Sequence, residues 1–489
     1  MSARLPLLGK TPFVLDPRLL EEATSAHAGL LSVSRAYRSL GVPGMVEANL
    51  RLRKRQRGFS EAQIIESLVL LQVAGGECPE DMGLLANDTC LERGLGYQAP
   101  KATAVREFLE RFHDKALEKL RPAREEQKSF IFPCSGPVAA LQEVQAGCVR
   151  RIAQLYEQRG QGQRIATIDQ DATIIESHKR AALHHYEGGR GYQPMVAVWA
   201  ELDLAVADEF RDGNVPAKQG PLTCAKMAFA ALPESVRQRY FRGDSACHEN
   251  ELLEWLKHPD RAQEPGGRIG FAVSAVMSLG LNGALKKIKD LAWKTFDTEE
   301  DGTLRQWAEV DFVPGKDYES KESQPLRYVG LRLLKPQGLL FADGSDRHFH
   351  AVITNRKEID GGRLLEWHRE KAGTVEHTHD EVKNELGGGQ MPSQRFGVNG
   401  AWFKLALLAY NLVSAMKGLC LEGEEQTVRL KKFRLLMIHL AGRMNRNNCV
   451  MGLRLCADVR AVKRMQKVWE VFALPTQATS AQARGGRGG

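Results

Sequence analysis

The stretch that most constrains this chain is a predicted buried strand that carries two acids, Thr167–Ile175. Successive side chains of a strand alternate between its faces, so Asp169 and Asp171 share one face, while the apolar residues Ile168 and Ala172 lie on the other. A carboxylate on a core strand costs free energy unless a cation or hydrogen bonds compensate it. Two interpretations stay open from the strand alone: an ordinary salt bridge or cap at the strand end, or a divalent-cation site.

An alternation of strands and helices follows this strand. We expect strands at 164–175, 192–201, 205–211, 239–244 and 269–275, with helices at 223–232 and 249–256. The order is three antiparallel strands followed by crossover helices onto a mixed sheet, which is an α/β fold with the element order of an RNase H-like core. That fold places one acid on the first strand and another at the end of the fourth. Asp244 occupies the second place, although it could also be the N-cap of the helix that follows.

The remaining sequence predicts how the core is divided. We expect a helical DNA-binding domain at 1–150, the first part of the core at 160–276, a β-rich insertion at 277–365, the second part of the core at 366–420, and a basic C-terminal region at 421–489 with a disordered tail. The insertion is predicted to form its own strands rather than to continue the core sheet. A strongly apolar helix at 402–416, capped by Asn399, is predicted to be part of the core.

A charged helix before that core helix is the candidate for a third acid. Glu376 and Asp380 are four residues apart and share a helix face, and Lys383 lies further along the same helix. The alternative is a solvated charged helix. Three histidines nearby are spaced poorly for zinc, and we expect them to be surface residues: His368, His377 and His379.

The charge distribution favours a polyanionic partner. Lys and Arg total 68 and Asp and Glu total 60, so the net charge is +8. The cations gather in two clusters, and the alternative for each is a solvated face. We expect the following cations to contact DNA phosphates: Arg51, Arg53, Lys54, Arg55, Arg57, Lys431, Lys432 and Arg434.

The cysteine pattern and the hydropathy indicate a cytoplasmic protein. Nine cysteines with no CxxC pair are typical of reduced thiols rather than of a disulfide framework. The longest apolar helix core, around 405–413, is far shorter than the roughly 20 residues that a membrane span needs, so no membrane partner is expected.

Three acids in this order resemble the triad of the DDE transposases of bacterial insertion sequences. Asp171 matches the Asp-x-Thr pattern of the first acid, Asp244 ends an aromatic-flanked strand, and Glu376-x6-Lys383 is similar to the end of a Tyr-x2-Arg-x3-Glu-x6-Lys signature. The sequence departs from that signature, because its Tyr position holds Arg369 and its Arg position holds Ala372. We expect Arg369 or Lys371 to supply the cation instead. Asp169 stays open as an outer group or as an alternative first acid.

The resemblance implies a catalytic activity, a cofactor and partners. Asp171, Asp244 and Glu376 would hold two Mg²⁺ ions, with Mn²⁺ as a substitute, and Lys383 would touch a phosphate at the transposon end. The protein would bind terminal inverted repeats in double-stranded DNA, cleave them, join the freed 3′ end to target DNA, and act as a homodimer at the bacterial nucleoid. The rival functions are an RNase H-like nuclease without strand transfer and a DNA-binding regulator whose acids are structural.

Overall fold

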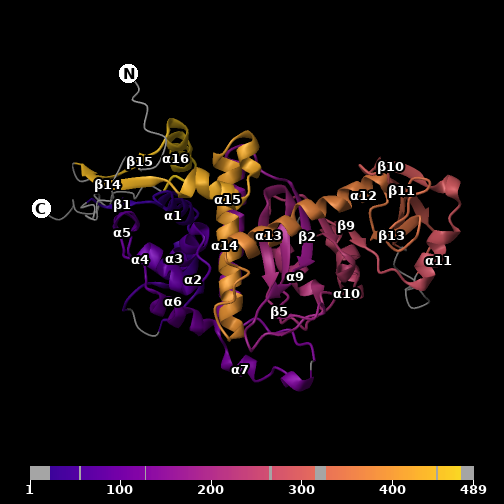
Figure 1. Cartoon of the computed structure of the whole chain (residues 1–489), viewed down its shortest axis with the longest axis horizontal. Helices are drawn as coiled ribbons and strands as arrows, with labels where there is room; N and C mark the ends of the chain where they lie inside the picture. The colour runs from indigo at the N-terminus through magenta and orange to yellow at the C-terminus, as the bar shows by residue number, and fades with distance from the viewer. Residues whose placement is uncertain are drawn as a thin grey trace, which may run out of the picture.

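A computed structural model of the chain describes residues 22–53, 57–126, 128–263, 267–313, 326–447 and 450–474. Figure 1 shows three parts in a row: the N- and C-terminal segments together at one side, a central sheet with helices, and a smaller β-rich part at the other side. The C-terminal tail, which the sequence predicts to be disordered, lies outside the described residues.

The centre of the fold is a nine-stranded mixed sheet with strand order β10-β11-β12-β13-β9-β8-β2-β6-β7. Its core strands are β2 (Ile165–Ala172), β6 (Met195–Trp199), β7 (Leu204–Glu209), β8 (Gln238–Gly243) and β9 (Ile269–Ser274). The strands β2, β6 and β7 are antiparallel, and β2, β8 and β9 are parallel. The helices α9 (Pro221–Ala231) and α10 (Asn250–Lys257) connect the last strands. The predicted order of strands and helices is therefore confirmed.

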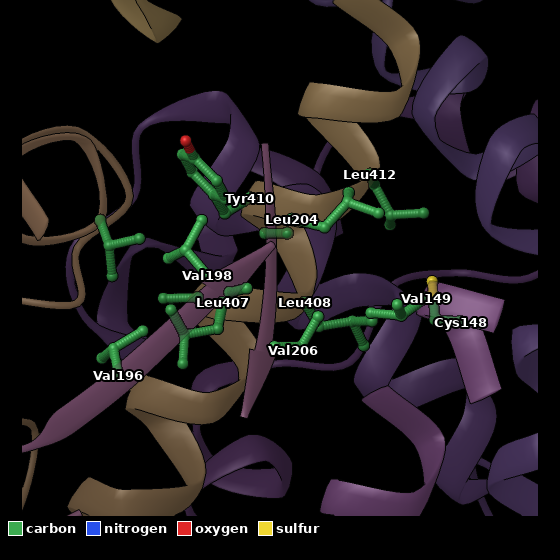
Figure 2. Close-up of a cluster of buried hydrophobic side chains, with 14 of the residues drawn as sticks. Cys148, Val149, Val196, Val198, Leu204, Val206, Leu407, Leu408, Tyr410 and Leu412 are labelled. Atoms are coloured by element: carbon green, nitrogen blue, oxygen red, sulfur yellow. The ribbon is translucent and has the colours of Figure 1, made fainter. Parts of the chain in front are cut away.

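A long helix supports the central strands from one side. The helix α14 (Phe396–Cys420) and the helix α8 (Gly136–Gln158) bring Leu407, Leu408 and Val149 against β6 and β7 (Figure 2). The helix α14 is the predicted core helix, but it begins at Phe396 rather than at residue 402. Asn399 lies inside its first turn and bonds the Tyr192 hydroxyl, so the prediction that Asn399 caps the helix is wrong.

Among the described residues, α14 is the one helix long and apolar enough to cross a membrane, and 94% of its most apolar stretch is buried inside the protein. The helix has 25 residues, more than the predicted 402–416, and its polar residues Asn399, Asn411 and Ser414 are buried as well.

The insertion continues the core sheet, so the prediction that it forms its own strands apart from that sheet is wrong. Its elements are α11 (Leu279–Lys287), β10 (Lys294–Thr298), β11 (Leu304–Val310), β12 (Arg327–Leu334) and β13 (Arg347–Thr354). Strand β13 pairs antiparallel with β9, with Val352 opposite Ser274. Without this pairing β9 would present an unpaired edge, and the insertion covers that edge. Trp307 is only 8% exposed and packs against Gly361, so it is a core residue of this part.

The two ends of the chain fold together. Strand β1 (Thr24–Ser25) pairs with β14 (Ala441–Asn447), which pairs with β15 (Val450–Cys456). The N-terminal helices are α1 (Leu30–Ser39), α2 (Val42–Asn49), α3 (Glu61–Ala74), α4 (Gly83–Ala86), α5 (Thr89–Leu95), α6 (Ala102–Leu109) and α7 (Lys115–Glu118). The C-terminal helices are α15 (Leu430–Phe433) and α16 (Val459–Val471). Ser60 caps α3 with a complete capping box.

Two further pieces lead to the site. A small sheet of β3 (Ile175–Glu176), β4 (Leu183–His184) and β5 (Arg190–Tyr192) follows β2. After the insertion come α12 (Gly361–Arg369), a 3-10 turn at Glu370–Gly373, and α13 (Val375–Glu385).

Candidate active site

The register between β2 and β8 brings the first two predicted acids together. The strands run parallel with Asp169 opposite Arg242, an offset of 242 − 169 = 73 residues. The last paired residues are Gln170 and Gly243, so Asp171 and Asp244 are the next residues along the two strands. Burial raises the pKa of Asp244, and the negative charge of Asp171 raises it further.

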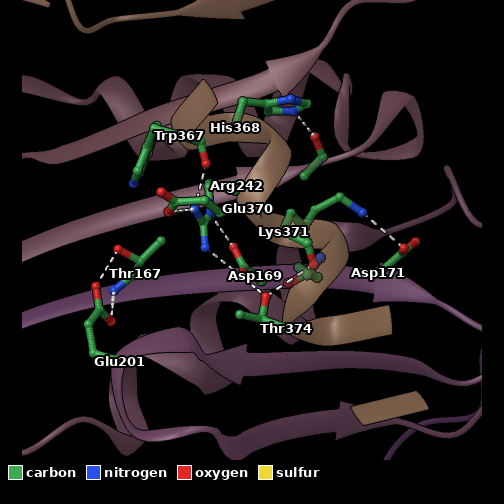
Figure 3. Close-up of polar contacts among 12 residues, drawn as sticks. Thr167, Asp169, Asp171, Glu201, Arg242, Trp367, His368, Glu370, Lys371 and Thr374 are labelled. Atoms are coloured by element: carbon green, nitrogen blue, oxygen red, sulfur yellow. Dashed lines mark hydrogen bonds and ion pairs between the residues drawn. The ribbon is translucent and has the colours of Figure 1, made fainter. Parts of the chain in front are cut away.

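Lys371 supplies the positive charge beside these acids. Its ammonium lies 3.0 Å from the Asp171 carboxylate, and the residue is only 7% exposed (Figure 3). Burial alone would lower the pKa of Lys371, but the charges of Asp171 and Asp244 outweigh burial and raise it. Of the two cations expected to replace the arginine of the signature, Lys371 therefore lies at the acids. Arg369 pairs instead with Asp297 of β10, at 3.2 Å.

Glu376 lies in the first turn of α13 and lines the same cavity as Asp244 and Lys371. The cavity measures 570 Å³ and is bounded on its far side by the insertion, through Phe296 and Arg305. Asp244 also accepts a hydrogen bond from the Ala246 amide at the start of a short 3-10 turn, so it caps that turn while facing the cavity. Asp244, Glu376 and Lys371 thus line one cavity at the junction of core and insertion, and Asp171 contacts Lys371.

The donor chemistry of this site fits a hard divalent cation. The adjacent carboxylates of Asp171 and Asp244 are oxygen donors of the type that Mg²⁺ prefers. Within the described ranges, however, no three Asp, Glu, His or Cys side chains are close enough together to hold a metal ion. Glu376 is exposed at the cavity wall, and the charge beside Asp171 is that of Lys371.

Asp169, the alternative first acid, is fully buried and already bonded. Its two carboxylate oxygens accept hydrogen bonds from Arg242 at 2.6 and 2.8 Å, and one of them also accepts a hydrogen bond from the Thr374 hydroxyl (Figure 3). Asp171 lies two residues further along the same strand face, where the Lys371 ammonium contacts it. The geometry therefore separates the two acids: Asp169 belongs to a closed network, and Asp171 lies at the site.

Comparison with known proteins identifies the chain. A family model described as "Transposase DDE domain group 1" matches residues 21–475. The chain belongs to this DDE transposase family. A solved structure, described as "Cryo-EM structure of piggyBac transposase synaptic complex with hairpin DNA (SNHP)", is similar with a TM-score of 0.37 and 11% identity, over 92% of this chain and 86% of that chain. The comparison with curated proteins gave no match.

Lys383, which the sequence predicts to touch a phosphate, is turned toward the backbone of the core. Lys383 donates a hydrogen bond to the Ile174 carbonyl at 3.0 Å, just beyond the acid-bearing strand. Burial lowers the pKa of this lysine. It lies near the site, but in this structure a backbone carbonyl is its partner.

The histidines near Glu376 correct the prediction of surface residues. His368 hydrogen-bonds the Gly243 carbonyl, directly before Asp244, and burial lowers its pKa to about 4. His379 is only 7% exposed, and burial likewise lowers its pKa to about 4. Both histidines are buried because the α12–α13 segment packs onto the sheet. The local sequence has no periodicity that would predict this packing.

The predicted DNA-binding cations of this transposase have different environments. Arg51, Arg57, Lys431 and Lys432 are exposed, and Arg53 pairs with Glu61. Lys54 and Arg55 lie outside the described residues.

Arg434 contradicts its predicted role. It is buried, and its guanidinium donates to the carbonyls of Val73, Gln72 and Glu385 at the C-terminal ends of α3 and α13. It is a structural cap for two helices rather than a surface cation.

Proposed function

We propose that this transposase binds the terminal inverted repeats of its own element and uses Asp171, Asp244 and Glu376, on an RNase H-like core, for Mg²⁺-dependent strand cleavage and strand transfer. The observation that carries the proposal is the strand register. In a chain of the DDE transposase family, it brings Asp171 and Asp244 to the same end of two paired strands, and Asp244 and Glu376 line one cavity there.

Each side chain has a role that follows from its position. Asp171 and Asp244 would hold the metal, because their adjacent carboxylates need a shared counter-charge. Glu376 would complete the set from the opposite wall of the cavity. Bound Mg²⁺, with Mn²⁺ as a substitute, would activate the attacking oxygen and stabilise the leaving oxygen at the scissile phosphate.

Two lysines would contact phosphate groups of the DNA. Lys371 neutralises the acids while no metal is bound, and on metal binding its ammonium becomes available to a phosphate oxygen. Lys383, half-buried beside Ile174, would contact the DNA strand where it leaves the site. Exposed cations such as Arg51, Arg57, Lys431 and Lys432 would contribute salt-dependent phosphate contacts, and two subunits would hold the paired ends.

The test uses linear duplex DNA that carries the sequences flanking the gene. Asp171→Asn, Asp244→Asn and Glu376→Gln should each bind this DNA as wild type does and lose Mg²⁺-dependent cleavage. Glu234→Gln, an exposed acid in the loop before β8, is the matched control and should cleave normally. If any one of the three site variants cleaves at the wild-type rate, the role given to that acid is wrong.

A second substrate separates the rival functions. A pre-cleaved end with a free 3′-hydroxyl should be joined to target DNA by the wild-type protein. Cleavage without joining would identify a nuclease that lacks strand transfer. Binding without cleavage, together with no thermal stabilisation by Mn²⁺, would identify a DNA-binding regulator, because a protein that binds metal in its folded state must gain stability from it.

A further inference from the structure

Two residues before Asp171 and Asp244, the paired strands β2 and β8 carry a buried ion pair. Asp169 and Arg242 lie opposite one another on β2 and β8, each two residues before a predicted metal ligand on the same strand face. Their side chains are 0% and 2% exposed. One face of the strand pair therefore carries a buried ion pair followed by two neighbouring acids.

The ion pair does not end at the sheet, because it reaches the segment that carries Lys371 and Glu376. Arg242 donates to the Trp367 carbonyl at 2.5 Å and to the Glu370 carboxylate at 2.7 Å, and Asp169 accepts from the Thr374 hydroxyl. Glu370 directly precedes Lys371, and Thr374 lies two residues before Glu376. Figure 3 shows these partners around the Arg242 guanidinium.

The shape of the guanidinium explains why an arginine is found at this position. Its fork binds the Asp169 carboxylate with two parallel hydrogen bonds, and its remaining nitrogen is free to bond the α12 end. The guanidinium also lies over the Trp367 ring, 5.3 Å from the ring centre. A lysine could make neither the fork nor this second set of contacts at once.

We propose that Asp169 and Arg242 are positioning residues that hold the segment 367–376 against the two acid-bearing strands, so that Lys371 and Glu376 face Asp171 and Asp244. These two side chains join β2 and β8 to the segment 367–376, which lies more than a hundred residues later in the chain. The DNA cleavage measurement below rests on the proposed function, whereas the amide hydrogen exchange measurement does not.

Single substitutions of this pair are poor tests. Removing one partner leaves an unpaired charge in the core, so the variant can fail to fold for a reason unrelated to positioning. Replacing both partners with apolar residues of similar volume commonly preserves folding. The informative variant is therefore the double substitution Asp169→Leu with Arg242→Met. The matched control is Asp208→Leu with Lys404→Met, which removes an equally buried ion pair between β7 and α14.

The first measurement is amide hydrogen exchange of the full-length protein. In the Asp169/Arg242 double variant, exchange should become faster across 367–376, while α14 and β6 keep their protection. The control double variant should leave 367–376 protected. Unchanged exchange in 367–376 of a folded double variant would overturn the proposal, whether or not the protein cleaves DNA.

The second measurement is cleavage at saturating DNA in Mg²⁺. Loss of positioning should lower the rate at least about 100-fold, as displacement of a catalytic group by about 1 Å can do, with DNA affinity unchanged. A folded double variant that cleaves at the wild-type rate would show that the pair only fills the core. Inactivity of the wild-type protein itself would count against the proposed function, and the exchange result would still decide the positioning role.

Discussion

Lys371→Met tests the electrostatics of the site most directly. The ammonium lies 3.0 Å from Asp171 with little exposure of either side chain, 9% and 18%. Removing it leaves Asp171 and Asp244 adjacent with no counter-charge, and breaking a buried pair in this way costs about 3–5 kcal/mol. Unfolding entropy is about 2.1 cal/mol/K per residue, or roughly 1 kcal/mol/K for 489 residues. The unfolding midpoint in EDTA should therefore fall by roughly 3–5 °C.

A divalent cation should reverse this loss. Without Lys371, the two acids offer an unoccupied anionic site, so Mn²⁺ should stabilise Lys371→Met more than it stabilises wild type. At about 100 times its dissociation constant, an ion bound only by the folded state adds about 2.7 kcal/mol. The assay is differential scanning calorimetry with EDTA and with a series of Mn²⁺ concentrations.

Two controls make the result specific. Lys371→Arg keeps the charge and should retain most of the stability in EDTA. Lys257→Met removes a lysine whose partner Glu254 is largely exposed, and it should change stability by less than about 1 kcal/mol. If Lys371→Met melts with wild type in EDTA and responds equally to Mn²⁺, Lys371 does not neutralise the acids and the reasoning fails.

Two further predictions concern groups that the fold buries. His368 has its pKa lowered from 6.5 to about 4, so the unfolded chain takes up its proton first as the pH falls. The stability that this neutral histidine contributes is complete above pH 6.5 and is lost between pH 6.5 and about 4, a difference of about 3 kcal/mol. Urea titrations should show a smaller loss over that range for His368→Gln, and an unchanged loss would contradict the burial of this ring. Arg434→Met strips three helix-end carbonyls of their donor and should cost roughly 3 kcal/mol or more. Lys432→Met should leave stability unchanged and reduce the salt dependence of DNA binding by about one ion. Equal stability of the two variants, measured in the same urea titrations, would show that Arg434 is not a structural cap.

The sequence predicted the elements of the core because local periodicity fixes them. Alternation along β2 placed Asp169 and Asp171 on one face, and both side chains do reach the same segment, through Thr374 and Lys371. The capping box at Ser60 likewise set the start of α3. The family resemblance then selected Asp171, Asp244 and Glu376, of which Asp244 and Glu376 line one cavity and Asp171 contacts Lys371, a third residue of its wall.

Only the tertiary structure decided the contacts between residues that are far apart in the chain. The sequence gives no register, and it is the register of β2 with β8 that turns a separation of 73 residues into adjacency. The sequence offered both Arg369 and Lys371 as the cation, and only the fold shows that Lys371 contacts Asp171 from 200 residues away. The burial of His368 and Arg434, and the pairing of β13 with β9, follow from which surfaces pack together. Local propensity acts over a few residues, whereas the charge and burial of a site depend on neighbours that folding brings in from the rest of the chain.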